Sequence, residues 1–179
     1  DALYLAERGW RVTAVEQRQS LLDRCRDMGI SMRLGARVPT LLCTDIEKTE
    51  QRGQLLDVLG GPGRWHLIHV CRYLYRPLMR VIRRALAPGG VVVYSTFMRG
   101  CELYGKPRND NFILDPRELL HHFGAGCAES DEHEGQFDAV AYREERLADG
   151  RPMQYVLAQK RRYYHHHDNT TSSGGGGGG

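Results

Sequence analysis

The hydrophobic and polar positions of residues 65–97 follow a strand, helix and strand pattern. A short apolar run at 67–70 suits a strand that is covered on both faces. After Pro77, which is tolerated in the first turn of a helix, apolar residues recur at helical spacing. Pro88 and two glycines end this helix, and the valines at 91–93 are typical of a strand. The pattern predicts a right-handed βαβ unit with two parallel strands.

The carboxyl ends of these two strands are the expected binding surface. Ligands of open parallel sheets bind beyond the carboxyl ends of the strands. The residues placed there are Cys71, Arg72 and Tyr73 after the first strand, and Thr96 and Phe97 after the second. His69 lies within the first strand among apolar neighbours, which favours a core histidine bonded to the backbone over a catalytic one.

Two further strands are predicted upstream, and an acidic residue stands at the end of each. The first ends at Glu16, and the second, at 39–46, contains Asp45 and Ile46. A carboxylate at a strand end can accept hydrogen bonds from both hydroxyls of a ribose. An Asp before an apolar residue can accept a bond from an adenine amino group while its neighbour covers the ring. A Glu that opens a loop and an Asp that caps the next turn are the alternatives.

The remaining segments complete an α/β pattern. Ser20 and Gly29 are expected to begin and end a helix between the two upstream strands. Residues 98–114 are rich in Gly, Pro and Asn, which predicts a long loop of the kind that contacts substrates. Asp115 is expected to cap a helix, and residues 137–160 have the pattern of a strand, a turn and a strand. An antiparallel hairpin therefore closes the predicted sheet.

Composition places the chain among globular proteins with one folded domain. Its 179 residues are 41% hydrophobic and 26% charged, which is ordinary for such a domain. The formal net charge of +3 does not imply a nucleic-acid partner, and no apolar run approaches the roughly 20 residues needed to span a bilayer. Five widely spaced cysteines without a C-x-x-C pair, and no visible signal peptide, favour a cytoplasmic location.

The domain is predicted to cover residues 1–162 and to be followed by a low-complexity tail at 163–179. The tail holds three adjacent histidines at 165–167 and ends in six glycines, which is typical of a disordered segment and not of a metal site. No metal site is predicted. At the other end, Asp1 opens a segment with the pattern of a helix interior, so the chain is expected to be the downstream part of a longer protein.

Several segments, in this order, resemble a known family. They are RYLYRPL at 72–78, LAPGG at 86–90, YSTF at 94–97, YGKPRNDNFIL at 104–114 and DPREL at 115–119. With the acidic strand ends, they resemble the class I S-adenosylmethionine-dependent methyltransferases, and more narrowly the tellurite-resistance-type enzymes and their small-molecule relatives. The resemblance covers residues 1–160. It implies a Rossmann-like α/β sheet that is mostly parallel and ends in an antiparallel hairpin.

The resemblance also implies a cofactor, S-adenosylmethionine, and a small-molecule acceptor. Glu16 would hold the ribose, and Asp45 and Ile46 would contact the adenine. The residues implied near the methionine end are Cys71, Arg72 and Tyr73. Those implied on the acceptor side are Arg72, Tyr73, Arg108 and Asn109. Methyl transfer from a sulfonium depends on alignment and needs no base, so no catalytic residue is predicted.

One part of the family pattern is missing from the sequence. The glycine-rich turn after the first strand, which approaches the cofactor closely, would precede Asp1. The first strand is therefore expected to be absent, which favours a fragment of an active enzyme. Two alternatives stay open: a non-catalytic methyltransferase-like module that binds a partner, and a fragment of an NAD-dependent oxidoreductase. The oxidoreductase alternative stays open because Glu16 could accept hydrogen bonds from the ribose of NAD equally well.

Overall fold

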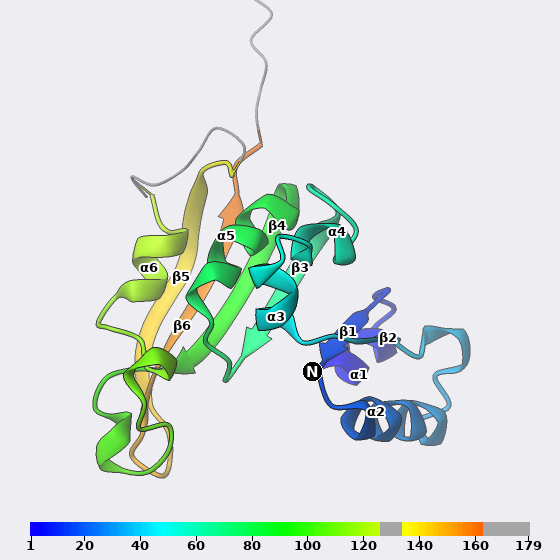
Figure 1. The fold of residues 1–179 in the computed structure, drawn as a ribbon, viewed down its shortest axis with the longest axis horizontal. Coiled ribbons are helices and arrows are strands. Elements are labelled where there is room, and N and C mark those ends of the chain that lie inside the picture. The colour runs from blue at the N-terminus through cyan, green and yellow to red at the C-terminus, as the bar shows by residue number, and fades with distance from the viewer. Residues whose placement is uncertain (126–133, 163–179) are drawn as a thin grey trace, which may run out of the picture.

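The computed structural model describes residues 1–125 and 134–162, so the predicted tail and its histidines lie outside the described residues. The helices are α1 (Ala2–Glu7), α2 (Gln19–Ser31), α3 (Ile46–Gln51), α4 (Leu55–Val58), α5 (Arg76–Ala85) and α6 (Glu118–Phe123). The strands are β1 (Thr13–Glu16), β2 (Thr40–Cys43), β3 (Trp65–Cys71), β4 (Leu86–Phe97), β5 (Phe137–Arg146) and β6 (Pro152–Lys160). Short 3-10 turns are η1 (Gly35–Arg37), η2 (Cys101–Leu103) and η3 (Asp110–Phe112). The predicted α/β class is confirmed (Figure 1).

β3, β4, β6 and β5 form a four-stranded sheet in that order. β3 and β4 run parallel and are joined by α5, as the pattern of residues 65–97 predicts. β6 runs antiparallel to β4, with Val156 opposite Tyr94. β5 and β6 form the expected antiparallel hairpin at the edge of the sheet. In this part of the chain the predicted sheet is confirmed.

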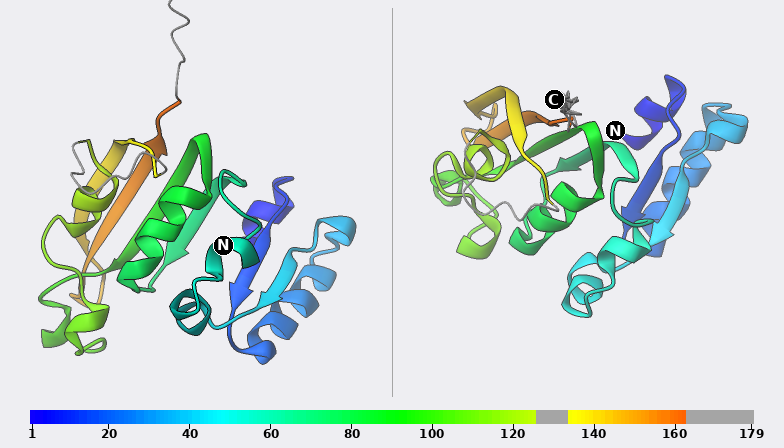
Figure 2. Two further views of the ribbon diagram at one scale, coloured as in Figure 1. Left: turned by 45° about the horizontal axis from the view of Figure 1, so that its top comes forward. Right: turned by 90° about the horizontal axis from the view of Figure 1, so that it is seen from above.

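β1 and β2 form a separate two-stranded parallel sheet, with Ala14 opposite Leu41. On its other edge β1 pairs with no described strand, and the same holds for β3. The two sheets stand beside each other with these edges facing (Figure 2). Apolar residues of the two strands, such as Val15 and Leu67, are only half-buried. Strands of this apolar composition are usually buried on both faces, and here the described residues bury them only in part.

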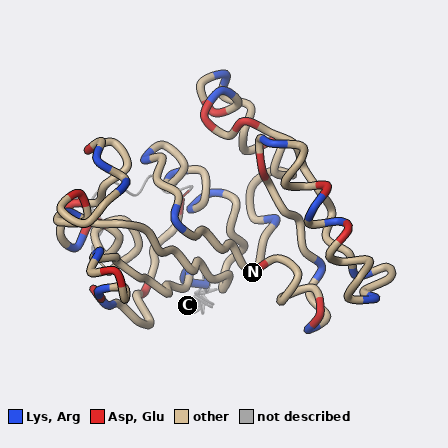
Figure 3. The backbone as a smooth tube through the Cα atoms, turned by 90° about the horizontal axis from the view of Figure 1, so that it is seen from below, with Lys and Arg blue, Asp and Glu red and all other residues tan. Residues whose placement is uncertain are grey.

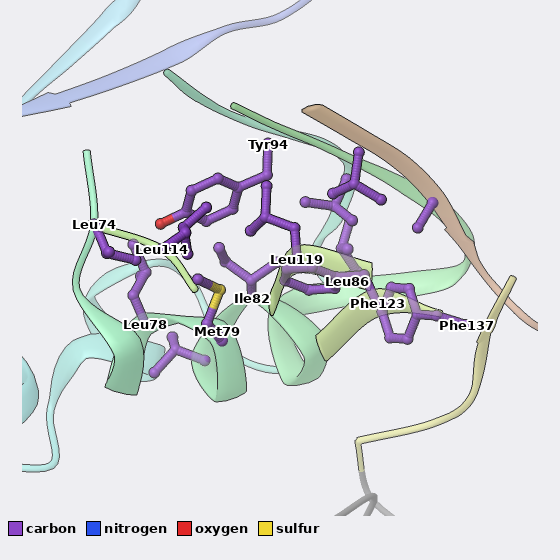
Figure 4. Packing of buried hydrophobic residues seen from close by; sticks show 14 of the residues in the cluster. Leu74, Leu78, Met79, Ile82, Leu86, Tyr94, Leu114, Leu119, Phe123 and Phe137 are labelled. Atoms are coloured by element: carbon purple, nitrogen blue, oxygen red, sulfur yellow. The ribbon is translucent and has the colours of Figure 1, made fainter. Parts of the chain in front are cut away.

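The main core lies between the four-stranded sheet and the helices α5 and α6 (Figure 4). Tyr94 at the middle of β4 packs near Phe123 of α6, with 6.2 Å between ring centroids, and Phe123 packs near Phe137 of β5 at 5.8 Å. Met79 and Ile82 bring the apolar stripe of α5 against these rings. Burial of this stripe holds α5 on the sheet and so orients the turn that leads from β3 into the helix.

A buried ion pair fixes the last turn of α5. Arg83 is 3% exposed and Glu134 is 4% exposed. Arg83 Nε donates to Glu134 Oε2 at 3.0 Å, and its Nη2 donates to the Gly135 carbonyl at 3.0 Å. Buried Lys160, at the end of β6, donates to the carbonyls of Arg83 and Leu86. These bonds tie α5 to β6 and to the residues that lead into β5.

α2 differs from the helix that the sequence predicts. Ser20 does not cap it, because the helix begins one residue earlier and has no side-chain cap. Gly29 does not end it and lies buried inside it, where a Cβ would come within 3.3 Å of Leu3 and Val38. A glycine is therefore needed here because the helix packs closely against α1 and the segment before β2. This contact joins distant segments, so no local sequence pattern reveals it.

α6 also begins later than predicted. Asp115 does not cap it, because its carboxylate accepts hydrogen bonds from Arg99. Arg117 then adopts a left-handed backbone with a φ of 62°, and its N–H donates to Glu144 Oε1 at 3.1 Å. The helix starts only at Glu118, after this break in the backbone.

The substitution Glu134→Gln tests how far the buried pair stabilises the fold. It leaves the Arg83 charge without its carboxylate in a site nearly closed to water, so we expect the free energy of unfolding to fall by about 3 kcal/mol. Urea denaturation followed by circular dichroism measures the loss. Glu145→Gln is the matched control, because Glu145 lies at the surface, 3.2 Å from Arg143, where an ion pair contributes at most about 1 kcal/mol. Equal losses in the two variants would contradict this role.

Candidate functional site

β3 and β4 end at the same side of the molecule, the lower side in Figure 1. In their register Cys71 lies opposite Ser95, and in the smaller sheet Glu16 lies opposite Cys43. The loop after β4 and the turn between β5 and β6 lie at this side too, and they are joined by a bond from Arg151 Nη1 to the Lys106 carbonyl at 2.7 Å. The predicted site residues are carried by these strand ends and this loop.

Glu16 is the last residue of β1 and is half-buried. Its Oε1 accepts from the Arg18 N–H at 3.0 Å and lies 3.3 Å from Arg18 Nε. Its carbonyl accepts from the Thr44 N–H, which fixes the strand end against the segment after β2. Within the described part of the chain Oε2 has no hydrogen-bond donor, so the carboxylate both opens a turn and can accept a further bond.

Asp45 caps α3, which is the alternative weighed for it from the sequence. Its Oδ1 accepts from the Lys48 N–H at 3.1 Å, and its Oδ2 lies 3.3 Å from Lys48 Nζ. The hydrogen bond from this N–H holds the pKa of Asp45 below its ordinary value. Ile46 follows as the first residue of the helix and is half-buried against the main core. The carboxylate therefore stays charged, and the cap fixes the position of Ile46 beside it.

Tyr73 joins the turn after β3 to α3. Its hydroxyl donates to Glu47 Oε1 at 3.3 Å, and its carbonyl accepts from the Tyr94 hydroxyl at 3.0 Å. Burial, together with the Glu47 carboxylate, raises the pKa of Tyr73 well above its ordinary value. The phenol is therefore a donor at neutral pH and not a base. Glu47 is not among the residues predicted from the sequence, where its local signal is its place in the first turn after Asp45.

The turn after β3 has an unusual backbone. Arg72 has a φ of 54°, a region that residues other than glycine rarely adopt. Its N–H donates to the Ser95 carbonyl at 2.7 Å, which continues the β3–β4 ladder past Cys71. Both Cys71 and Arg72 are exposed. Arg151 chiefly, with a smaller contribution from Arg72, holds the pKa of Asp149 below its ordinary value, so the Arg72 charge lies near the β5–β6 turn.

A hollow of about 460 Å³ opens beyond the end of β4. It is lined by Phe97, Lys106, Pro107, Arg108, Asn109 and Phe112. The hollow thus includes both loop residues predicted for the acceptor side, Arg108 and Asn109. Asn109 Oδ1 accepts from the Asn111 N–H at 2.9 Å, which begins η3 and shapes the loop. No described hydrogen bond joins Arg108 or Asn109 to the turn that carries Arg72, so the structure places the predicted acceptor residues in two separate groups.

The loop around this hollow is held by Arg76, in the first turn of α5. Its Nε and Nη2 donate to the two oxygens of Glu118 at 2.7 and 3.0 Å, and the same guanidinium donates to the carbonyls of Asn111 and Ile113. Burial alone would raise the pKa of Glu118, but hydrogen bonds from His122 and Arg76 lower it to about 2. No sequence pattern reveals this pair, because 42 residues separate the partners.

His69 is not the core histidine that the sequence predicts. The residue is exposed, and its Nδ1 lies 3.7 Å from Asp1 Oδ2. Side chains alternate along a strand, and Ile68 and Val70 face the main core. His69 therefore faces the opposite side of the sheet, away from α5.

Solved structures show which fold this arrangement belongs to. The chain is similar to the [4+2]-cyclase SpnF, with a TM-score of 0.62 and 14% identity over 90% of this chain and 70% of that one. It is also similar to the 1,6-didemethyltoxoflavin-N1-methyltransferase of Burkholderia thailandensis, with a TM-score of 0.56 and 19% identity over 88% of this chain and 64% of that one. The chain has the fold of the class I S-adenosylmethionine-dependent methyltransferases, as the sequence resemblance implies.

A third similar structure is a variant of the 16S rRNA (adenine(1408)-N(1))-methyltransferase from Catenulisporales acidiphilia, with a TM-score of 0.56 and 14% identity over 91% of this chain and 80% of that one. It was solved with S-adenosylmethionine, and the toxoflavin enzyme was solved with S-adenosylhomocysteine. The cofactor implied by the sequence is thus the one seen in these neighbours. Their acceptors differ, so the fold leaves the acceptor open. No protein-family model and no curated protein matches the chain.

The described residues give no other site of comparable definition. Among residues 1–125 and 134–162, no three His, Cys, Asp or Glu side chains are grouped so that they could hold a metal ion. None of the helices in these ranges has the length and apolar character needed to cross a membrane. Basic and acidic residues alternate along the described parts of the backbone (Figure 3).

The substitution Glu118→Gln tests whether the bond to Arg76 depends on charge. We expect the free energy of unfolding at neutral pH to fall by about 2 kcal/mol, because hydrogen bonds to charged groups contribute about 1.5–3 kcal/mol. The pKa of Glu118 is lowered from 4.5 to about 2 in the folded state, so its contribution is complete above pH 4.5 and is lost as the pH falls toward 2. Urea denaturation over this pH range should show the wild type and the variant converging.

Glu7→Gln is the control for this pH series, because Glu7 is exposed at the end of α1 and lies 3.7 Å from Arg8. It should change the free energy of unfolding by no more than about 0.5 kcal/mol at any pH in the series. A difference between wild type and Glu118→Gln that stays constant with pH would rule out a role for the carboxylate charge.

Proposed function

We propose that this chain carries out S-adenosylmethionine-dependent methyl transfer to a small-molecule acceptor. The observation that carries the proposal is the placement of Glu16 and Asp45 at the carboxyl ends of adjacent parallel strands. Ligands of such sheets bind at that edge, where carboxylates accept hydrogen bonds from a nucleoside. The fold of the neighbours and the acids of this chain therefore support the same cofactor.

The residues present fit the adenosine part of the cofactor. Glu16 has an oxygen able to accept from the ribose hydroxyls, since Arg18 engages the other one. Asp45 is charged and would accept from an adenine amino group through Oδ2, which Lys48 Nζ now approaches to 3.3 Å, with the half-buried Ile46 beside it to cover the ring. Cys71 and Tyr73 would line the methionine end. When bound, S-adenosylmethionine supplies an electrophilic methyl group on a sulfonium with a good leaving group.

The chain itself contributes binding and alignment. Tyr73 stays protonated and donates its O–H to Glu47, so its hydroxyl oxygen is held in place to accept a hydrogen bond from a ligand. Arg72 carries a positive charge at the end of the sheet, and Arg108 and Asn109 line the hollow beyond β4. Holding the acceptor atom in line with the methyl carbon supplies much of the rate in such a transfer. No general base is needed for an acceptor that is already nucleophilic.

The proposal includes one further strand between β1 and β3, followed by a glycine-rich turn. In support, each of these strands has an unpaired edge among the described strands, and their apolar side chains are half-buried. Backbone N–H and C=O groups of inner strands need partners, and unpaired edges invite pairing. The turn after such a strand would lie between Glu16 and Cys71. We accordingly propose that the chain is the downstream portion of a longer enzyme.

The acceptor is proposed to be a small molecule and not a nucleic acid. In support, the hollow beyond β4 has the volume of a small-molecule site, for which about 300–1,000 Å³ is usual. Nucleic-acid sites extend over a broad basic surface, whereas here basic and acidic residues are interspersed (Figure 3).

The substitution Glu16→Gln tests the cofactor site. The protein for this test is the chain extended by any residues that its gene encodes before Asp1. Calorimetry should show that this protein binds S-adenosylhomocysteine. Glu16→Gln should weaken that binding about 10- to 100-fold, because the amide replaces a charged acceptor of the ribose bonds. Glu7→Gln removes a carboxylate from α1 and should leave the affinity unchanged.

Three results would count against the proposal. Failure of S-adenosylhomocysteine to bind at millimolar concentration would favour a non-catalytic module. Binding that Glu16→Gln leaves intact would remove the ribose role of that residue. Binding of NADH, measured by fluorescence titration and not displaced by S-adenosylhomocysteine, would favour an oxidoreductase.

A further inference from the structure

Two segments carry the residues proposed for the two ends of the cofactor, and they follow strands of different sheets. Asp45 and Ile46 open α3, directly after β2 of the small sheet. Cys71 and Tyr73 lie at the end of β3 and in the turn after it, in the four-stranded sheet. Among the described strands no backbone ladder joins the two sheets. The position of one segment relative to the other therefore depends on contacts outside the sheets.

Tyr73 is fixed to the four-stranded sheet through its backbone. Its carbonyl accepts from the hydroxyl of Tyr94, which is buried in the core, at 3.0 Å. One residue earlier, the Arg72 N–H donates to the Ser95 carbonyl at 2.7 Å. The half-buried Tyr73 ring also packs against the main core. The phenol therefore extends from a turn whose position is set by β4.

The start of α3 is fixed to the small sheet by bonds of its own. The Thr44 N–H donates to the Glu16 carbonyl at 3.0 Å, and Asp45 then caps the helix through the Lys48 N–H. Thr49 Oγ1 donates to the Asp45 carbonyl at 2.7 Å, which closes the first turn. None of these bonds reaches the turn after β3.

Glu47, in the first turn of α3, makes a bond that does. Its Oε1 accepts from the Tyr73 hydroxyl at 3.3 Å, and both residues are half-buried, which limits competition from water. Within the described part of the chain Glu47 forms no ion pair, and the neighbouring Lys48 lies 3.3 Å from Asp45 Oδ2. Ile46 also contacts the main core, but apolar packing has no direction, so the hydrogen bond is the contact that fixes the geometry.

We propose that Glu47 is a positioning residue of the cofactor site. Through the Tyr73 hydroxyl it holds the segment proposed to bind adenosine in place against the turn proposed to line the methionine end. A ligand that spans both segments binds more tightly when they are already in place, since less freedom is lost on binding. This inference rests on the proposed methyl transfer and adds to it a residue that acts through another.

Binding of S-adenosylhomocysteine and of adenosine tests the inference by calorimetry, again on the chain extended by any residues that its gene encodes before Asp1. Glu47→Ala should weaken S-adenosylhomocysteine, which spans both segments, about tenfold, because a hydrogen bond to a charged group is lost. Adenosine contacts the α3 side alone, so its affinity should change by no more than about twofold, which also shows that the variant is folded. Glu47→Gln keeps an acceptor for the Tyr73 hydroxyl and should bind S-adenosylhomocysteine within about threefold of the wild type.

The Tyr73→Phe background shows whether Glu47 acts through the phenol. Tyr73→Phe already lacks the bond, so adding Glu47→Ala to it should weaken S-adenosylhomocysteine by no more than about twofold further. A carboxylate that acted on α3 directly, through its charge at the start of the helix, would cost the same in both backgrounds. Glu50→Ala is the matched control, because Glu50 is half-buried on the same helix and its side chain takes part in no described hydrogen bond. It should leave both affinities unchanged.

The outcomes separate this inference from the proposed function. In a wild type that binds S-adenosylhomocysteine, the positioning role would be overturned by an unchanged affinity in Glu47→Ala, by an equal loss for adenosine, or by a loss of the same size in the Tyr73→Phe background. Each of these results would leave the methyl transfer standing. A wild type that binds neither ligand would overturn the proposed function, and the positioning role with it.

Discussion

β4 is the strand on which both the core and the site depend. It pairs in parallel with β3 on one side and antiparallel with β6 on the other. Tyr94 at its middle is buried in the core, and its hydroxyl donates to the carbonyl of Tyr73 in the turn after β3. Phe97 at its end lines the hollow. Tyr94 and Phe97 face opposite sides of the sheet, and a one-residue slip in register would turn each ring to the side opposite its present one, so packing and site geometry would change together.

The sequence alone predicted those features that local physics decides. The βαβ unit at 65–97 followed from a switch between strand and helical spacing, and the hairpin followed from alternation around a turn. The sequence allowed Asp45 either to contact an adenine or to cap the next turn, and the structure shows that it caps α3. Its role toward a nucleoside remains a proposal, because a cap fixes a carboxylate without showing what else it accepts from.

Features that depend on contacts between distant segments were not predicted. Gly29 looks like a helix stop until Leu3 and Val38 are packed against it. The sequence gives no local signal for the pairing of Arg76 with Glu118. Several arginines lie along α5, and nothing in the sequence distinguishes the one that pairs. Where such contacts compete with a propensity worth less than about 1 kcal/mol, the contacts decide the structure.

The two halves of the proposed site differ in how firmly the described chain builds them. The cofactor half is divided between the small sheet, with Glu16, and the end of β3, with Cys71. The described links between the N-terminal part and β3 are side-chain contacts, such as the bond from Tyr73 to Glu47 and the packing of α3, and not a ladder of backbone hydrogen bonds. One such bond contributes about 1 kcal/mol, so the described chain holds this half less firmly than a shared sheet would. The hollow is lined by the end of β4 and by the loop that follows it, and none of its lining residues belongs to the strand ends that carry Glu16 and Cys71.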